Sequence, residues 1–202
     1  MLDLAVERSW FSRGSRSVAG VDEVGRGPLA GPVVAAAVLV GPDTALLEGV
    51  NDSKQLTQRR RDELAAAICA SLGFAVGAAS TREIDRLNIR RATALAMRRA
   101  MARLPRAADT ILVDGLQVPE LGLAHEAIVD GDAGCYAIAC ASIVAKTVRD
   151  RLMRRLATHY PSYGWERNAG YATAEHREAI KQSGVTPHHR RSFTPVLQQE
   201  LF

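Results

Sequence analysis

Residues 18–32 read Val18-Ala-Gly-Val-Asp22-Glu23-Val-Gly25-Arg26-Gly27-Pro28-Leu-Ala-Gly31-Pro32. The part up to Val24 is mostly apolar and β-branched, which predicts a buried strand. Asp22 and Glu23 interrupt this strand, although ionised carboxylates are costly to bury unless they are paired or bind a cation. A second apolar run follows over 33–40, so the pattern indicates a β-hairpin with a wide loop. Acids beside a loop whose backbone can approach an anion suggest divalent-metal chemistry on a phosphate.

The composition is that of a folded globular protein. The chain has 202 residues, enough for one full domain with room for a small appendage. Hydrophobic residues make up 47% and charged residues 24%, near the average for soluble domains. The longest apolar run, 33–40, is much shorter than the ~20 residues that cross a bilayer, and the acid-containing start does not resemble a secretory signal. We therefore expect neither a membrane segment nor a secreted protein.

Net charge and cysteine content indicate a class of partner and a cellular compartment. The net charge is +4, a sign that suits a polyanion such as nucleic acid, although the excess is modest. The three cysteines are odd in number and form no C-x-x-C pair, which is typical of a reducing compartment and of a chain without structural zinc. We expect a cytoplasmic protein, with a monomer as the default.

Hydrophobic periodicity predicts a mixed α/β protein. Strands are expected over 18–24, 33–40, 74–79, 110–115 and 124–129, and helices over 57–70, 88–104 and 136–158. Ser80 with Glu83 forms a capping-box signature. The inward stripe of the helix over 88–104 is predicted to consist of Ile89, Leu95, Met97, Met101 and Leu104. Strands followed by alternating helices and strands favour a mixed central sheet with helices packed against it.

The chain changes character after Pro161, where Gly, Pro, His and aromatic residues become frequent. We divide it into an N-terminal lead segment, 1–17, a main domain, 18–162, and a small C-terminal helical extension, 163–202. Thr194 as a cap and Pro195 at the next position predict a short terminal helix in this extension.

Four acids, Asp22, Glu23, Asp114 and Asp132, lie at or just past the end of an apolar strand. Gathered without a cation they would repel one another, and some would stay protonated. Mg²⁺ or Mn²⁺ removes this conflict, because both ions prefer carboxylate and water oxygens. Two such ions about 3.5–4 Å apart would activate a water and stabilise the leaving oxygen of a phosphodiester.

The alternative for each acid alone is a structural role. A single Asp at a strand end is most often a turn former or helix cap, and we interpret Asp130 in this way. Four such sites, with two inside an apolar run, favour the metal site. Because consecutive strand residues face opposite sides, Asp22 and Glu23 can share a site only if the strand ends or bulges there, or if Glu23 adds its main-chain carbonyl. The turn lacks the G-x-G-x-x-G and G-x-x-x-x-G-K-[ST] patterns, so its glycines are better suited to a sugar-phosphate backbone.

Five blocks in order resemble ribonuclease H type 2, the bacterial HII class. They are Gly20 to Pro32, Asn51-Asp-Ser-Lys54-Gln-Leu56, Val113-Asp114-Gly115, Gly131-Asp132-Ala133 with Ala141 to Arg151, and Tyr160 through Gly170-Tyr171 to Phe193. The resemblance covers about 18–196. It implies a ribonuclease-H-like fold with a C-terminal helical segment that completes the substrate site.

The resemblance also implies an activity and a set of roles. The expected enzyme is a metal-dependent endonuclease that cuts the RNA strand of RNA–DNA hybrids and the 5′ side of ribonucleotides embedded in duplex DNA, leaving a 3′-hydroxyl and a 5′-phosphate. The catalytic and metal-binding residues would be Asp22, Glu23, Asp114 and Asp132. The substrate-binding residues would be Gly25, Arg26 and Gly27 at the ribose 2′-hydroxyl, Tyr171 at the junction sugar, and Lys54 and Lys146 at phosphates. The 2′-hydroxyl is the group that distinguishes RNA from DNA.

Several further residues receive structural interpretations. Lys146 is equally well explained as a lysine that extends along its helix to solvent. Residues assigned to a solvated helix face or to nonspecific DNA contacts are Arg149, Arg151, Arg154 and Arg155. Residues expected to lie too far apart for a metal site, with capping or hydrogen-bond roles, are His176, His188 and His189. Gly134 and Ala172 depart from the lysine and glycine usual in the family, which puts turnover and substrate preference in doubt.

The last residues add a hypothesis about a partner. Gln198-Gln-Glu-Leu201-Phe202 resembles the pentapeptide by which bacterial replication proteins bind the sliding clamp. The alternative is that Val196, Leu197 and Leu201 pack back onto the domain. For the whole chain, the alternatives to the hybrid-specific endonuclease are another nuclease of the same broad fold and a catalytically silent nucleic-acid-binding module.

Overall fold

The computed structural model describes residues 2–194 and 196, and its centre is a mixed five-stranded sheet of order β3-β2-β1-β4-β5. The strands are β1 Val18–Val24, β2 Val33–Val40, β3 Gly73–Ala79, β4 Thr110–Asp114 and β5 Glu126–Ile128. β1 and β2 pair antiparallel, as do β2 and β3, whereas β4 runs parallel to both β1 and β5. The predicted mixed sheet and its hairpin are confirmed; β5 is shorter than the expected 124–129.

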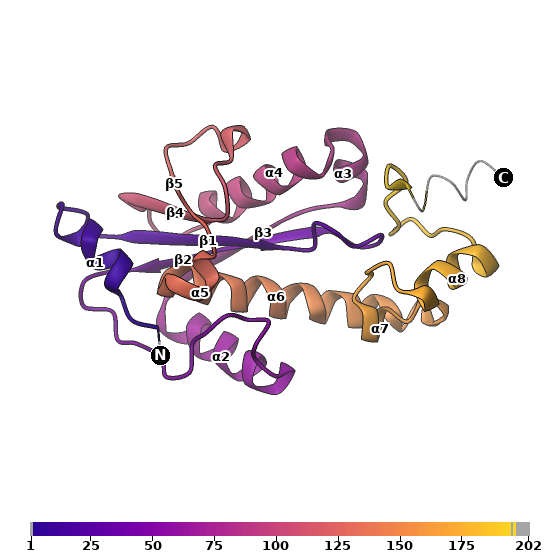
Figure 1. Ribbon diagram of the computed structural model, residues 1–202, viewed down its shortest axis with the longest axis horizontal. Helices are drawn as coiled ribbons and strands as arrows, with labels where there is room; N and C mark the ends of the chain where they lie inside the picture. Colours follow the sequence, from indigo (N-terminus) through magenta and orange to yellow (C-terminus); the bar gives the residue numbers. More distant parts are fainter. Residues whose placement is uncertain (1, 195, 197–202) are drawn as a thin grey trace.

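Helices cover both faces of the sheet (Figure 1). The long α6, Tyr136–Ala157, packs on one face with α2, Gln58–Ser71, outside it. The opposite face carries α4, Ile89–Ala102, next to α3, Thr81–Leu87. Shorter elements are α1 Ala5–Phe11, α5 Gly131–Gly134, α7 Trp165–Asn168, α8 Ala174–Ser183, and the 3₁₀ turns Pro119–Leu121 and Pro161–Tyr163. In the described residues no helix combines the length and apolar character needed to cross a bilayer.

Alternation along the strands assigns each side chain to one face. Val18 and Leu112 belong to the core under α6, whereas Val21 and Val113 belong to the core under α4. The sheet lies very close to α6 at Gly20, where a Cβ would overlap the backbone of Ala137. This contact brings the first turns of α6 directly over the middle of β1.

The buried stripe of α4 differs from the sequence prediction. Its buried residues are Ala92, Thr93, Ala94, Ala96, Met97 and Ala100, so that Met97 alone of the five predicted residues is fully buried. The other four, Ile89, Leu95, Met101 and Leu104, are partly buried at the margin of the same core. The physical reason is the close approach of α4 to β3, where a Cβ at Gly77 would overlap the carbonyl of Ala96. Only small side chains fit beneath the helix, and the large ones pack to its sides.

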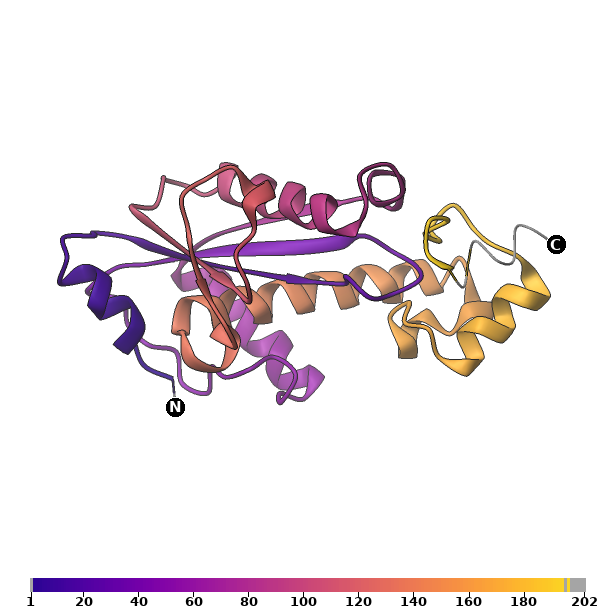
Figure 2. The same ribbon diagram turned by 45° about the horizontal axis from the view of Figure 1, so that its top comes forward.

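The C-terminal segment lies at one end of the molecule, beyond the loop that joins β1 to β2 (Figure 2). A separate cluster of buried residues holds it there, with Trp165 and Tyr163 from the segment, Met153 from α6, and Leu29 and Ala30 from the β1–β2 loop. The Trp165 and Tyr163 rings stack with centroids 5.2 Å apart. The loop that carries the glycine-rich turn therefore packs against residues more than 120 positions away in the sequence.

The first turn of α6 depends on a side chain from α1. Glu7 is fully buried, and its Oε1 accepts hydrogen bonds from the backbone N–H of Ala137 (2.7 Å) and from Cys135 Sγ (3.2 Å). We expect Glu7→Ala to lower the free energy of unfolding by about 1–2 kcal/mol, because it leaves a buried helix N-terminal donor without an acceptor. Glu7→Gln keeps an acceptor oxygen and should cost less. Urea unfolding of both variants measures the difference, and equal losses would contradict the capping role.

Candidate active site

The four predicted acids lie where strands β1 and β4 separate. Pairing between the two strands ends at Val21 and Val113, one residue before Asp22 on β1 and Asp114 on β4. Asp132 lies in α5, the short helix after β5, and its backbone N–H donates to Asp114 Oδ1 at 3.3 Å. Glu23 follows Asp22 on β1. The open end of the sheet thus collects acids from three elements.

The two adjacent acids of β1 face opposite sides of the sheet. β1 pairs with β2 in continuous register as far as Val24, so the strand neither ends nor bulges at Asp22. Asp22 shares the α6 side with Val18, and the alternation places Asp114 on that side as well. Glu23 faces the α4 side. Asp22 and Glu23 were expected to share a site if the strand ended or bulged there, and it does neither. A role for the main-chain carbonyl of Glu23 stays a prediction.

Burial and neighbouring charges raise the pKa of Asp22, Glu23 and Asp114. Asp22 is 6% exposed, and burial, followed by the charges of Glu23 and Asp114, holds its pKa well above the usual range. Burial also raises the pKa of Glu23, although the Arg26 guanidinium, 3.1 Å from its Oε1, opposes the shift. The pKa of Asp114 is raised by burial and by the charge of Asp132. Such mutual repulsion is the electrostatic condition that a multivalent cation relieves.

Two cations already contact the acids. Lys54 Nζ lies 2.8 Å from Asp132 Oδ2, and Arg26 pairs with Glu23. With these side-chain positions, no three Asp, Glu, His or Cys groups in the described part of the chain surround a common point suitable for an ion. The donor set itself fits Mg²⁺ or Mn²⁺, because it consists only of carboxylate oxygens, and the two cations pair with only two of the four acids.

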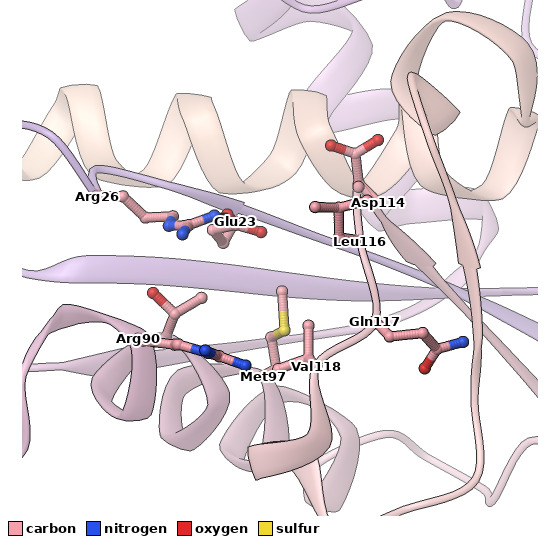
Figure 3. Close-up of a pocket in the computed structure, with 10 residues that line it drawn as sticks. Glu23, Arg26, Arg90, Met97, Asp114, Leu116, Gln117 and Val118 are labelled. Atoms are coloured by element: carbon pink, nitrogen blue, oxygen red, sulfur yellow. Dashed lines mark hydrogen bonds and ion pairs between the residues drawn. The ribbon is translucent and has the colours of Figure 1, made fainter.

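A cleft of about 500 Å³ opens on the α4 side of the acids (Figure 3). Its lining includes Glu23 and the residue Asp114, and Arg26 and Arg90 contribute positive charge. Leu116, two residues after Asp114, also lines it and is 78% exposed. The cleft provides access to two of the acids from solvent.

The glycine-rich loop is held from behind by two buried arginines. Arg149, expected on a solvated helix face, is 0% exposed, so this prediction is wrong. Its guanidinium donates to the carbonyls of Ala30, Pro32 and Ala169. Arg190, for which the sequence analysis gave no individual role, is also 0% exposed and donates to carbonyls of the same loop. Arg149 falls four residues before the buried Met153, and this helical spacing was the signal available in the sequence.

The predicted substrate-binding residues are distributed around the acids. Tyr171 is 43% exposed and lies beside the glycine loop, since a Cβ added at Gly27 would be 3.8 Å from its ring. Lys54 adjoins the acids, as described above. Lys146 forms an ion pair with Asp150 at 2.8 Å and lies one helical turn after Ser142, whose hydroxyl lowers the pKa of Asp22. Ser142 is a contact of the acids that sequence reasoning missed.

The histidines are closer together than predicted. His176 Nε2 and His189 Nε2 are 3.1 Å apart, although 13 positions separate them, so the expectation of distant residues is wrong while the hydrogen-bond role is confirmed. His189 Nδ1 accepts from the Thr186 backbone N–H at 2.9 Å, and its Nε2–H therefore donates to His176. His176 Nε2 also accepts from Trp165 Nε1 at 3.0 Å. This pattern requires both imidazoles to be neutral.

The buried histidines predict a loss of stability in acid. Burial, together with the nearby His176 and His188, lowers the pKa of His189 to about 3, against 6.5 for a free imidazole. The unfolded state therefore binds an extra proton between these values, so the contribution is present above pH 6.5 and is lost as pH falls toward 3. The raised acid pKa values act in the opposite direction. We expect wild type to lose more stability than His189→Gln between pH 7 and pH 5 in urea unfolding, and parallel curves would contradict this.

Together, the mixed sheet with helices on both faces and the buried acids at its open end define a metal-dependent nuclease of the ribonuclease-H-like fold. The family model for ribonuclease HII matches residues 19–196. The chain belongs to the ribonuclease HII family and is a ribonuclease H endonuclease.

Individual relatives agree with this assignment. The chain is 55% identical to the ribonuclease HII of Paracoccus denitrificans, over 96% of this chain and 92% of the relative. The crystal structure of ribonuclease H2 from Pyrococcus horikoshii is similar with a TM-score of 0.77 at 30% identity, covering 92% of this chain and 97% of the other. The structure of a PCNA:RNase HII complex from Archaeoglobus fulgidus gives a TM-score of 0.75 at 28% identity, covering 90% and 96%.

Proposed function

We propose that this protein hydrolyses the RNA strand of RNA–DNA hybrids and cuts duplex DNA on the 5′ side of an embedded ribonucleotide, leaving a 3′-hydroxyl and a 5′-phosphate. The observation that carries the proposal is the group of buried, mutually repelling acids at the open end of the sheet, next to the loop of Gly25, Arg26 and Gly27. Family membership favours this activity over a silent binding module or an unrelated nuclease of the same fold.

The acids have the role of metal ligands in this proposal. The residues that would hold Mg²⁺ or Mn²⁺ are Asp22, Glu23, Asp114 and Asp132. A bound divalent cation would supply a water of lowered pKa and would neutralise charge on the phosphate. Lys54, whose side chain is 74% exposed, is positioned to exchange its contact with Asp132 for a substrate phosphate. Lys146 is also proposed to bind a substrate phosphate, after its ion pair with Asp150 opens. It lies on α6, one helical turn after Ser142.

Substrate selection is assigned to the loop and to the C-terminal extension, 163–202. Gly25, Arg26 and Gly27 would contact the 2′-hydroxyl of the ribose, and the exposed Tyr171 would pack against the sugar at the RNA–DNA junction. The support is the position of the Tyr171 ring, directly across from Gly27. The 5′ side of cleavage in this proposal rests on the family assignment.

The decisive experiment uses a DNA duplex with one ribonucleotide, incubated with Mg²⁺ or Mn²⁺. We expect a single cut 5′ to the ribonucleotide, which disappears on chelation with EDTA and in Asp114→Asn. A continuous RNA–DNA hybrid serves as the second substrate. Cleavage of the hybrid without a cut at the single ribonucleotide would reject the role of the loop in recognising the ribose. Failure to cleave either substrate would reject the proposed function.

A sliding clamp is the protein partner that we propose, bound through Gln198–Phe202. These residues lie outside the described part of the chain; the support is the motif and the complex of PCNA with RNase HII from Archaeoglobus fulgidus. Deletion of 198–202 should abolish clamp binding and leave cleavage of the single-ribonucleotide duplex unchanged. Unchanged clamp affinity would reject this role. We also propose that the protein is a monomer and that it acts in the cytoplasm.

A further inference from the structure

Arg149 and Arg190 are two fully buried cations whose hydrogen bonds go to main-chain carbonyls. Both are 0% exposed, and in the part of the chain that the structure describes neither has a carboxylate within ion-pair distance. Burial lowers the pKa of both guanidinium groups, that of Arg190 to about 9. Burying a charge in this way is costly unless its hydrogen bonds are satisfied in a fixed geometry.

Arg190 binds both ends of the loop between β1 and β2. Nη2 donates to Gly25 O at 2.5 Å and to Gly31 O at 2.8 Å, and Nη1 donates to Arg26 O at 2.8 Å. The Nε of Arg190 donates to Gly31 O as well, at 3.0 Å. Two of its three carbonyl partners, Gly25 O and Arg26 O, belong to the Gly25-Arg26-Gly27 turn that is proposed to contact the ribose.

Arg149 connects the same loop to the turn that carries Tyr171. Nε donates to Pro32 O (3.0 Å) and Nη2 to Ala30 O (3.1 Å), while Nη1 donates to Ala169 O (2.9 Å). Ala169 has a positive φ of 47°, a conformation that is strained for alanine and that its surroundings must stabilise. One guanidinium thus joins the loop to a residue two positions before Tyr171.

The backbone of the two segments is also joined directly. The Leu29 N–H donates to Gly170 O and the Gly31 N–H donates to His188 O, both at 2.8 Å. These bonds set the direction of each segment. The arginines add charged, forked contacts that a neutral backbone pair does not supply, and a lysine ammonium cannot reproduce the planar fork.

We propose that Arg149 and Arg190 are positioning residues that fix the separation between the Gly25-Arg26-Gly27 loop and Tyr171, and thereby determine the preference for a single ribonucleotide in DNA. The inference rests on the proposed function. A single-ribonucleotide duplex offers one 2′-hydroxyl. Its cleavage therefore requires the loop and Tyr171 to contact the same nucleotide, in only one position of the enzyme along the duplex. A continuous hybrid offers a 2′-hydroxyl at every RNA nucleotide, so a displaced loop still finds a productive register.

The test compares Arg190→Lys and Arg149→Lys with Arg59→Lys, a control whose side chain is 91% exposed on α2. kcat and KM are measured on a single-ribonucleotide duplex and on a continuous RNA–DNA hybrid, with thermal unfolding recorded for each variant. We expect kcat on the single-ribonucleotide duplex to fall at least about tenfold more than kcat on the hybrid, because misplacement of a bound group reduces turnover steeply. The control should leave both values unchanged.

The hybrid reaction separates this inference from the proposed function and from misfolding. Hybrid cleavage shows that a variant is folded and that its acids are intact, whereas a wild type inactive on both substrates would reject the proposed function instead. If Arg190→Lys loses hybrid cleavage as well, the test rests on Arg149→Lys, which keeps the three carbonyl contacts of Arg190. The quantity compared is then the loss of kcat on the single-ribonucleotide duplex relative to the loss on the hybrid. Equal losses on the two substrates in both variants would overturn the positioning role.

Discussion

Asp22→Asn is expected to abolish cleavage and, without divalent cations, to make the protein more stable. Its carboxylate is one of the acids proposed to hold the metal, and an amide loses the charge that attracts the cation, so we expect kcat to fall by about 10³-fold or more. The folded protein, however, gains from the change. Burial and the charges of Glu23 and Asp114 disfavour the ionised carboxylate, whereas an amide of the same shape carries no charge.

The direction of the pH effect follows from the raised pKa of Asp22. In the unfolded chain the carboxyl ionises near its ordinary pKa of 3.8, so the stability it contributes is present below that pH and is lost as pH rises through the higher folded pKa. At pH 7 Asp22→Asn should therefore be more stable than wild type, because the amide has no charge to bury. Guanidinium unfolding in EDTA measures this gain.

A metal-binding experiment provides the control for this prediction. Added Mn²⁺ should raise the unfolding temperature of wild type more than that of Asp22→Asn, because the variant has lost a ligand. Asp109→Asn, an exposed acid at the other end of β4, serves as the matched variant and should keep full activity. A fully active Asp22→Asn would contradict the assignment of this residue to the site.

Gly25→Ala and Gly27→Ala are expected to fail for different reasons. Gly25 has a φ of +92°, and a Cβ there would overlap the guanidinium of Arg149, which three hydrogen bonds hold in place. We expect Gly25→Ala to lose about 3 kcal/mol or more of stability, from backbone strain together with the displaced, buried arginine. Gly27 has no such constraint: a Cβ would meet only the Tyr171 ring, at an ordinary contact distance of 3.8 Å.

Gly27→Ala should therefore be as stable as wild type, within about 0.5 kcal/mol. Its methyl group would cover the surface of the loop, next to Tyr171, against which we place the ribose, so we expect kcat/KM on the single-ribonucleotide duplex to fall by about 100-fold. Urea unfolding and cleavage assays on the two variants separate the effects. Normal cleavage by Gly27→Ala would place the ribose elsewhere, and a stable Gly25→Ala would contradict the packing of Arg149.

Local sequence was sufficient to predict the strands, the three longest helices and the candidate acids. Alternating and helical periodicities depend on neighbours a few residues apart, which is why β1, β2 and α6 begin where predicted and Ser80 with Glu83 forms the expected capping box. The acids were visible for a related reason. A carboxylate pair inside an apolar run conflicts with burial, and this conflict can be detected without knowing what packs against the strand.

Contacts between distant segments could not be predicted in this way. Arg149 was assigned to solvent because a basic residue on a helix is usually exposed, and only the carbonyls of Ala30, Pro32 and Ala169, brought together by the fold, make its burial possible. The distance between His176 and His189 depends likewise on how the C-terminal segment returns to the β1–β2 loop.

By itself, the sequence of this protein determined its strands, its three longest helices and the choice of candidate acids, because each follows from the polarity and shape of residues close together in the chain. Only the tertiary structure decided that Asp22 and Glu23 face opposite sides of the sheet, and that two buried arginines support the loop beside them. The physical reason is that a buried charge is stabilised by partners from anywhere in the chain, and local sequence does not specify those partners.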